Sequence, residues 1–275
     1  MGLLCAGIGY GAYSFWEANP NMQAAIAQYV DNGEIKTLEV RYTPEKIMEL
    51  NHKELLSNNE RTFQKADLQF YPHVLFNVKY TAPDKKTKEG TLLWSLVNGE
   101  MVVDCHNWET THGFEDAINA QATRNDFKIL NALEKSKGKM TIEQLQKELQ
   151  LEQDVLVSLL ENAKKKHLIV QKGNEIQLHF QNPRLLVVPQ TKISQCIVSK
   201  PYNHSQKIAR RYSPSQIEKI SKAAFGQDFT IRTQEAIYLP IYSIDILNQD
   251  GSVRTAEFNA VTGNLIKSHY LDSAF

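Results

Sequence analysis

Apolar and polar residues recur along this chain in two different periods. Between residues 126 and 182, apolar positions three and four residues apart predict three consecutive helices. In residues 74–80 and 242–247 they alternate one by one, which predicts half-buried strands, and Asp250-Gly251 after the second run is typical of a tight hairpin turn. These patterns predict an α+β fold with antiparallel sheets.

The sequence also contains an internal repeat. Three pairs of segments correspond in the same order: 41–50 (RYTPEKIMEL) with 211–220 (RYSPSQIEKI), 71–80 with 238–247, and 94–102 with 258–266. We therefore expect two related units, at residues 32–122 and 190–270. Each would consist of a strand, a helix and an antiparallel meander whose apolar face packs on that helix.

The first pair of segments has the residues of a helix start. Thr43 and Ser213 suit the N-cap position, and the prolines that follow them suit the first helical position. Gln216 completes a capping box in the second copy. The cap does not require the preceding arginines, Arg41 and Arg211, so we keep these two residues as candidate contacts for a partner.

The second copy resembles the PepSY family of small extracytoplasmic α+β modules. The likeness lies in the capped helix that begins at Ser213, the strand ending YSIDI at 242–246, the Asp250-Gly251 turn, and the strand ending NAVTG at 259–263. This resemblance implies a module that regulates or inhibits a partner protein outside the cytoplasm. It does not imply catalysis.

Residues 126–182, between the two copies, resemble a winged-helix domain. The likeness rests on a first helix that ends at a KGK motif, a short second helix capped by Thr141, a third helix over 152–167, and a small hairpin at Gly173. In DNA-binding members of this family the third helix enters the major groove, and basic residues contact phosphate.

The charges of this segment do not favour nucleic acid. Residues 126–180 carry nine lysines against eight acidic residues, and the third helix opens with acidic residues that phosphate would repel. Lys164, Lys165 and Lys166, at the end of that helix, are the candidate phosphate contacts, although they also suit the helix dipole. A DNA-binding transcriptional regulator therefore stays as an alternative function.

The first residues form an uncharged apolar run. As a helix, residues 2–16 (GLLCAGIGYGAYSFW) would span roughly 22 Å at about 1.5 Å per residue, against about 30 Å for the hydrocarbon core of a bilayer. Aromatic residues crowd its distal end, as they do at membrane interfaces. We expect residues 1–18 to form a short apolar helix that anchors a single-pass membrane protein, whose sidedness no flanking charge decides.

Three other interpretations of this run carry less weight. The lack of Lys or Arg before it fits a start that has lost upstream residues. Cys5 matches a lipoprotein site only in part, because the residue before it is large. The Gly7-x-Gly9-x-x-Ala12 spacing outlines a dinucleotide fingerprint, but Pro20 interrupts the helix that it needs, so we expect no cofactor.

Overall charge and cysteine content exclude some classes of protein. Thirty-one Lys and Arg balance thirty-one Asp and Glu, so no global field steers the chain to nucleic acid, and three distant cysteines make no disulfide scaffold. One chemical cluster remains: Asp104, Cys105, His106, Glu109 and His112. A metal-dependent enzyme centred on Cys105 is the second alternative, although neighbours on a strand point to opposite faces.

Four aromatic residues complete the candidate contacts for a partner: Tyr71, Trp94, Trp108 and Tyr238. The sequence contains no phosphate-binding loop, zinc-protease motif or hydrolase nucleophile motif. We therefore predict a non-enzymatic, membrane-anchored scaffold that binds or regulates another protein and holds neither a cofactor nor a metal.

Overall fold

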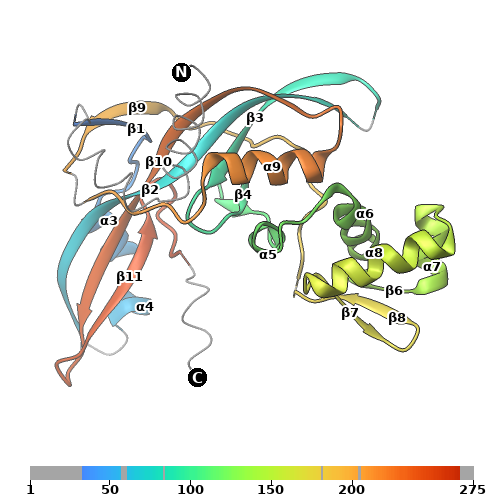
Figure 1. Ribbon diagram of the computed structural model, residues 1–275. Helices are drawn as coiled ribbons and strands as arrows, with labels where there is room; N and C mark the ends of the chain where they lie inside the picture. Colours follow the sequence, from blue (N-terminus) through green and yellow to red (C-terminus); the bar gives the residue numbers. More distant parts are fainter. Residues whose placement is uncertain (1–32, 57–60, 83, 181, 204–205, 267–275) are drawn as a thin grey trace, which may run out of the picture. The chain divides into compact units, whose positions relative to one another are not determined.

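The computed structural model describes residues 33–56, 61–82, 84–180, 182–203 and 206–266 (Figure 1). These residues form helices and mainly antiparallel sheets, in agreement with the predicted α+β class. The expected N-terminal apolar helix, residues 1–18, lies outside the described ranges. Within those ranges, no helix is both long enough and apolar enough to cross a membrane.

The chain divides into two compact units that interleave segments from both halves of the sequence. Unit 1 comprises Met1–His73, Ser194–Arg210 and Ala236–Phe275, and unit 2 comprises Val74–Ile193 and Arg211–Glu235. Two long strands, β2 (Thr62–Thr81) and β10 (Thr230–Leu247), each contribute residues to both units.

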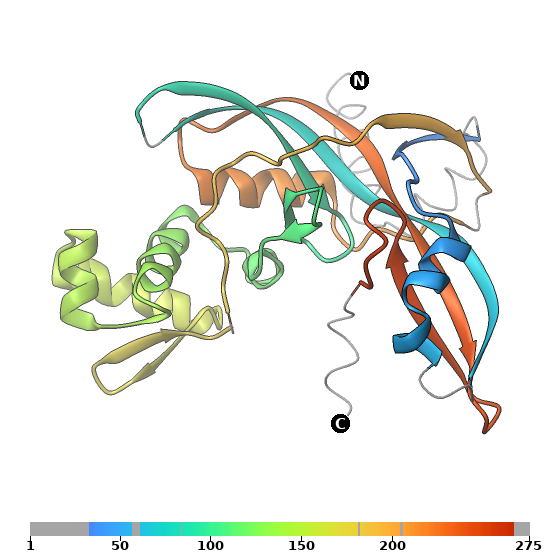
Figure 2. The ribbon, with the colours of Figure 1, turned by 180° about the vertical axis from the view of Figure 1, so that it is seen from behind.

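Unit 1 combines part of the sheet with two short helices. Its own elements are β1 (Glu34–Leu38), α3 (Pro44–Leu50), α4 (His52–Leu56), β9 (Ile197–Pro201) and β11 (Val253–Asn259). The strand order is β2-β10-β1-β9, and β11 pairs with β10. β1 is antiparallel to β9, while its Thr37 is the parallel partner of Tyr238 in β10. Figure 2 shows α3 and α4 beside the β10–β11 hairpin.

Unit 2 contains the other part of this sheet, with strand order β5-β4-β3-β2-β10. The elements that belong to it alone are β3 (Thr87–Ser95), β4 (Met101–Asp104), β5 (Glu109–Thr110), α5 (Phe114–Asn119) and α9 (Pro214–Phe225). The apolar side chains of α9 lie in the same core as those of β2 and β3, where Trp94 is completely buried.

Three helices and a small sheet follow α5 within unit 2. Their order is α6 (Arg124–Lys135), β6 (Lys139–Thr141), α7 (Ile142–Leu149), α8 (Gln153–Lys165), β7 (Ile169–Lys172) and β8 (Glu175–Leu178), and the small sheet has the order β6-β8-β7. The predicted cap of the second helix is confirmed, because Thr141 accepts the N–H of Gln144. Thr123 forms a similar capping box with Asp126 at the start of α6.

The predicted helix starts in the repeated segments are also confirmed. The hydroxyl oxygens of Thr43 and Ser213 accept the N–H of the residue three positions later, and a proline opens each helix. Gln216 closes the predicted capping box on Ser213. These ends are local in origin, since each needs only neighbouring residues.

The repeat pattern predicts that each helix packs on the meander of its own segment, and this prediction is wrong. Ile47 of α3 shares a core cluster with Ile244 and Phe258, which belong to the second segment. Ile217 of α9 shares a cluster with Trp94 of the first segment. Each helix therefore shares its core with strands of the other segment.

The exchanged elements are fastened by the same hydrogen bonds in both units. The N–H groups of Arg41 and Tyr42 both donate to the carbonyl of Ala260 at 3.0 Å. In unit 2, the N–H groups of Arg211 and Tyr212 donate to the carbonyl of Leu96 at 2.8 and 2.9 Å. Because Leu96 and Ala260 align with each other in the sequence, the helix start of one segment is bound to the turn of the other.

An extended segment after β8 is hydrogen-bonded to both β3 and β4. The buried hydroxyl of Thr191 accepts the N–H of Leu93 at 2.9 Å and donates to the carbonyl of Val102 at 2.5 Å. Earlier in the same segment, the N–H groups of Leu185 and Leu186 donate to the carboxylate of Glu134 in α6. Side chains thus replace backbone partners where this segment leaves the sheet.

Candidate functional site

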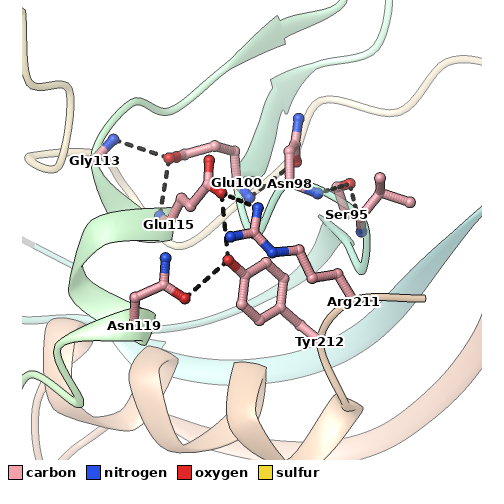
Figure 3. A network of polar contacts seen from close by, with 9 residues as sticks. Ser95, Asn98, Glu100, Gly113, Glu115, Asn119, Arg211 and Tyr212 are labelled. Atoms are coloured by element: carbon pink, nitrogen blue, oxygen red, sulfur yellow. Dashed lines mark hydrogen bonds and ion pairs between the residues drawn. The ribbon is translucent and has the colours of Figure 1, made fainter. Parts of the chain in front are cut away.

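A buried carboxylate lies at the centre of a polar network in unit 2 (Figure 3). Glu100 follows the Asn98-Gly99 turn between β3 and β4, and its side chain is only 8% exposed. One carboxylate oxygen accepts the N–H groups of Gly113 and Glu115 at 2.9 and 3.0 Å, and the other accepts the hydroxyl of Thr111 at 2.6 Å. Glu100 therefore caps α5 from a distant part of the sequence.

Burial changes the protonation of this carboxyl group. Removal from water raises the pKa of Glu100 to about 7, and the nearby charge of Glu115 adds to the increase. The three hydrogen bonds favour the charged form and therefore oppose this increase in pKa, but burial has the larger effect. Glu100 thus gains or loses a proton near neutral pH.

The segment before α9 joins the same network. Figure 3 shows Arg211 and Tyr212 directed at α5, where the Arg211 guanidinium is bound to the carboxylate of Glu115. The Tyr212 hydroxyl donates to Asn119 Oδ1 at 3.0 Å and lies 3.4 Å from Glu115 Oε1. Burial, together with the charge of Glu115, raises the pKa of Tyr212 to about 12, so its phenol stays neutral at physiological pH.

The turn beneath this network is held by its own side chains. The Ser95 hydroxyl accepts the N–H groups of Val97 and Asn98 at 3.2 and 3.3 Å, and Asn98 Oδ1 accepts the N–H of Glu100 at 3.1 Å. The indole of Trp94 donates to the Gly99 carbonyl at 2.7 Å. The polar groups of this site are therefore used to join the turn, α5 and the start of α9.

The two predicted arginines have different surroundings. Arg211 forms the ion pair with Glu115 described above. Arg41 is exposed, and its side chain has no hydrogen bond or ion pair with any residue that the structure describes. The four predicted aromatic contacts also differ, since one is in the core and three are half-buried.

Trp94 lies in the core and not on the surface, which corrects its prediction as a contact residue. It is 0% exposed and packs edge-on against Phe114, with ring centroids 5.0 Å apart. In the sequence, a large aromatic residue on the buried face of a strand looks the same as one that contacts a partner at the surface. Only the tertiary packing distinguishes the two cases.

The other three aromatic residues are half-buried. Tyr71 donates its hydroxyl to Glu257 at 2.6 Å, and burial together with this carboxylate raises the pKa of its phenol. The ring of Tyr238 has the Lys207 Nζ at 5.4 Å from its centroid. Trp108 has a left-handed backbone, with φ of 54°.

Two of the three lysines predicted to contact phosphate are engaged within unit 2. Lys166 Nζ lies 2.6 Å from the carboxylate of Asp126, which is only 2% exposed. Lys164 is bound to Glu161 and donates to Gln171 at 3.0 Å. Lys165 alone of the three is exposed.

The residues of the Cys105 cluster are divided between the core and the surface. Cys105 is 0% exposed, and burial raises the pKa of its thiol to about 12, so the sulfur is protonated at neutral pH. The carboxylate of Glu109 is bound to Arg184 at 2.9 Å. In the ranges that the structure describes, no three His, Cys, Asp or Glu side chains are placed to hold one metal ion.

Sequence reasoning missed Glu100, Glu115 and Thr191. Glu100 looks like an ordinary turn residue, and Glu115 looks like a favourable acidic residue in the first turn of a helix. A glutamate directly after Asn-Gly is a weak signal, because its burial depends on α5 folding back over the turn. Thr191 lies in a segment without periodicity, and its role needs both β3 and β4.

Comparisons of the chain with protein-family models, with curated proteins and with solved structures found no match.

Proposed function

We propose that this chain is a non-enzymatic, membrane-anchored scaffold that binds another protein, and that it consists of two related α+β repeats flanking a winged-helix domain. The matching hydrogen bonds at Ala260 and Leu96 support the repeat. The succession of α6, β6, α7, α8 and the β7–β8 hairpin, with the sheet order β6-β8-β7, supports the winged helix. The proposed anchor is the apolar run at residues 2–16.

The residues on the outward face of α8 favour a protein partner over DNA. At about 100° per residue, the positions opposite the buried side chains of this helix are Asp154, Ser158, Glu161 and Lys165. Val155 and Val157, at 47% and 48% exposed, lie on the two margins of that face. A duplex placed there would bring phosphate against carboxylates and would leave the valines in contact with water.

The lysines at the end of α8 support the same choice. Lys166 neutralises the buried Asp126, which caps α6, so this lysine has a structural partner. Lys164 is held by Glu161 and Gln171. Of the three predicted lysines, Lys165 is left to meet phosphate, and one exposed lysine supplies little of the affinity that several phosphate contacts give.

The polar network around Glu100 supports a role without catalysis. Each oxygen of its carboxylate accepts hydrogen bonds from unit 2 itself, and Arg211 is bound to Glu115. A general acid or base has to face its substrate, whereas these groups face one another. Their arrangement is that of a structural joint.

Photo-crosslinking in cells tests the proposal. The full chain would carry a photo-reactive residue at Ser158 on the outward face of α8, or at the exposed Lys147 of α7 as the matched control. We expect one reproducible protein adduct at 158 and none at 147, with loss of the 158 adduct in Val155→Asp. Equal labelling at both positions would contradict a specific protein surface.

A DNA-binding experiment tests the alternative function, that of a transcriptional regulator. The full chain in detergent micelles would be titrated against a fluorescent duplex over a series of salt concentrations. We expect no saturable, salt-dependent binding, and no difference between the wild type and Lys165→Glu. Tight binding that weakens with salt and is lost in Lys165→Glu would favour the DNA-binding regulator. This variant is chosen because Lys165 is exposed, so the fold does not depend on it.

Cell fractionation tests the anchor independently. We expect the full chain to stay with membranes after alkaline carbonate washing, and a variant without residues 2–16 to be released. Release of both would contradict anchoring by this segment. A reporter fused at Phe275 then gives the sidedness, for which the PepSY resemblance favours the extracytoplasmic face.

A further inference from the structure

The turns that bind the two helix starts have the same backbone but different surroundings. Gly99 and Gly263 have φ of 72° and 76°. The N–H of Ser95 donates to the Glu100 carbonyl at 3.0 Å, and the N–H of Asn259 donates to the Asn264 carbonyl at 2.9 Å. The two turns can therefore be compared position by position.

In unit 2, α5 covers the turn. A Cβ added to Gly99 would lie 2.9 Å from Ile118 Cδ1, 3.1 Å from the Tyr212 ring and 3.4 Å from the Cα of Glu115. In unit 1, the three atoms nearest to a Cβ on Gly263 all belong to the Tyr42 ring, at 3.0 to 3.2 Å. The tyrosine is thus present in both units, whereas the covering helix is found at Gly99.

The exposure of the equivalent side chains differs in the same direction. Tyr212 is 3% exposed, while Tyr42 is half-buried. Glu100 is buried, while Asn264, its counterpart in the sequence alignment, is exposed. Arg41 is the counterpart of Arg211, and among the described residues it has no carboxylate partner.

We propose that Arg41, Tyr42 and Asn264, which we name the Arg41 surface, bind a short carboxylate-bearing helix of a partner protein. The inference rests on the proposed protein-binding function and adds the chemistry of the partner. α5 is the template, since it supplies to the equivalent surface of unit 2 a carboxylate, an aliphatic side chain three residues later and a side-chain oxygen four residues later. These three positions lie on one face of a helix.

The charge and shape of the Arg41 surface fit such a helix. An exposed guanidinium offers a planar set of donors that matches a carboxylate, and pairing gains strength as the helix excludes water. Gly263 itself is buried, and the Tyr42 ring lies where a Cβ on it would be, so a partner helix would contact this half-buried ring and not the glycine. In the template the Tyr212 hydroxyl donates to Asn119, and we assign the same role toward the partner to the Tyr42 hydroxyl.

A peptide with the sequence of α5 is the probe. It would comprise residues 111–122 (THGFEDAINAQA), with a hydrocarbon staple joining positions 116 and 120, because an isolated helix of this length is marginal in water. The staple leaves the positions of Glu115, Ile118 and Asn119 open. Binding to the full chain in detergent micelles would be followed by fluorescence anisotropy of a labelled peptide.

We expect saturable binding that weakens about five- to tenfold in Arg41→Ala and by a similar factor when the peptide carries Gln in place of Glu115. The two changes together should weaken binding little more than either alone, because they remove the same ion pair. Arg254→Ala, an exposed arginine of β11, is the matched control and should bind as the wild type does.

Three results would overturn the inference. One is binding that is insensitive to Arg41→Ala. Another is binding that is lost in Arg211→Ala but kept in Arg41→Ala, since the peptide would then have replaced α5 in unit 2. The third is a large gain in binding on deletion of residues 267–275, which would make this chain's own end the occupant. Failure here with a retained cross-link at Ser158 would leave the protein-binding function intact, so the two proposals fail separately.

Discussion

The carboxylate of Glu100 accepts the N–H of Gly113 at 2.9 Å, so a side chain from the β3–β4 turn holds the residue that precedes α5. Gly113 is the N-cap of that helix and has no side chain to cap it. Glu100 supplies the missing acceptor from thirteen residues away. Because the same carboxyl group has a pKa near neutrality, this contact is linked to pH.

The stability of the protein should therefore contain a component that decreases as pH rises. The pKa of Glu100 is 4.5 ordinarily and about 7 in the fold, so between these values the folded state holds a proton that the unfolded state releases. The contribution is fully present below pH 4.5 and is lost as pH rises through 7, with an upper limit of about 3 kcal/mol. The free energies of unfolding of the wild type and of Glu100→Gln, measured in urea from pH 4.5 to 8, should become more similar as the pH decreases. Parallel profiles, like those expected for exposed Glu39→Gln, would contradict this.

His73 should give the opposite dependence on pH. Burial lowers the pKa of this histidine from 6.5 to about 4, and its Nδ1 lies 2.9 Å from the Tyr71 carbonyl. Between these pH values the unfolded chain binds a proton that the folded chain excludes, so stability falls as pH falls from 6.5 to 4. The difference between the wild type and His73→Asn in urea unfolding should shrink on acidification. A difference that stays constant over this range would show that His73 is not the group responsible.

Removal of the Thr191 hydroxyl should destabilise the protein. Thr191→Val keeps the shape of the side chain but leaves Leu93 N–H and the Val102 carbonyl without this partner in a buried place. We expect a loss of about 1–3 kcal/mol in the free energy of unfolding, measured in urea. Thr191→Ser keeps the hydroxyl and should lose less. The reverse order would mean that the methyl group, and not the hydrogen bonds, is important.

Two adjacent lysines should differ in their effect on stability. Lys166→Ala leaves the carboxylate of Asp126, 2% exposed, without its cation, whereas Lys165→Ala changes an exposed side chain. We expect the first variant to lose on the order of 1–3 kcal/mol and the second to stay within about 0.5 kcal/mol of the wild type. Thermal unfolding followed by circular dichroism distinguishes them. Equal losses would remove the structural role assigned to Lys166.

The close contact of α5 with the turn should make Gly99 intolerant of a side chain. Gly99→Ala places a methyl group against Ile118 and Tyr212 and also strains a residue with positive φ. Gly173→Ala is the matched control, because φ is 60° there and no atom lies within 4 Å of the added Cβ. Gly99→Ala should lose about 1 kcal/mol more stability than the control. Equal losses would mean that backbone strain alone explains both.

Local signals in the sequence predicted the helix starts and turns well. Thr43, Thr141 and Ser213 cap helices as expected, and Asp250-Gly251 lies at the tip of the β10–β11 hairpin with Gly251 at φ of 80°. Each of these features needs only a few neighbouring residues, so the chain specifies it without knowledge of the rest. The site was predicted less well, since Trp94 belongs to the core and Glu100 was not recognised.

The sequence by itself determined the α+β class and the positions of the capped helices. Tertiary structure alone decided that α3 lies on β10–β11 and α9 on β2–β3, and that Glu100 is buried and Lys166 neutralises Asp126. The reason is that caps and turns depend on neighbours in the chain. Burial and ion pairing depend on which distant segments meet, and here each helix shares a core with strands of the other segment.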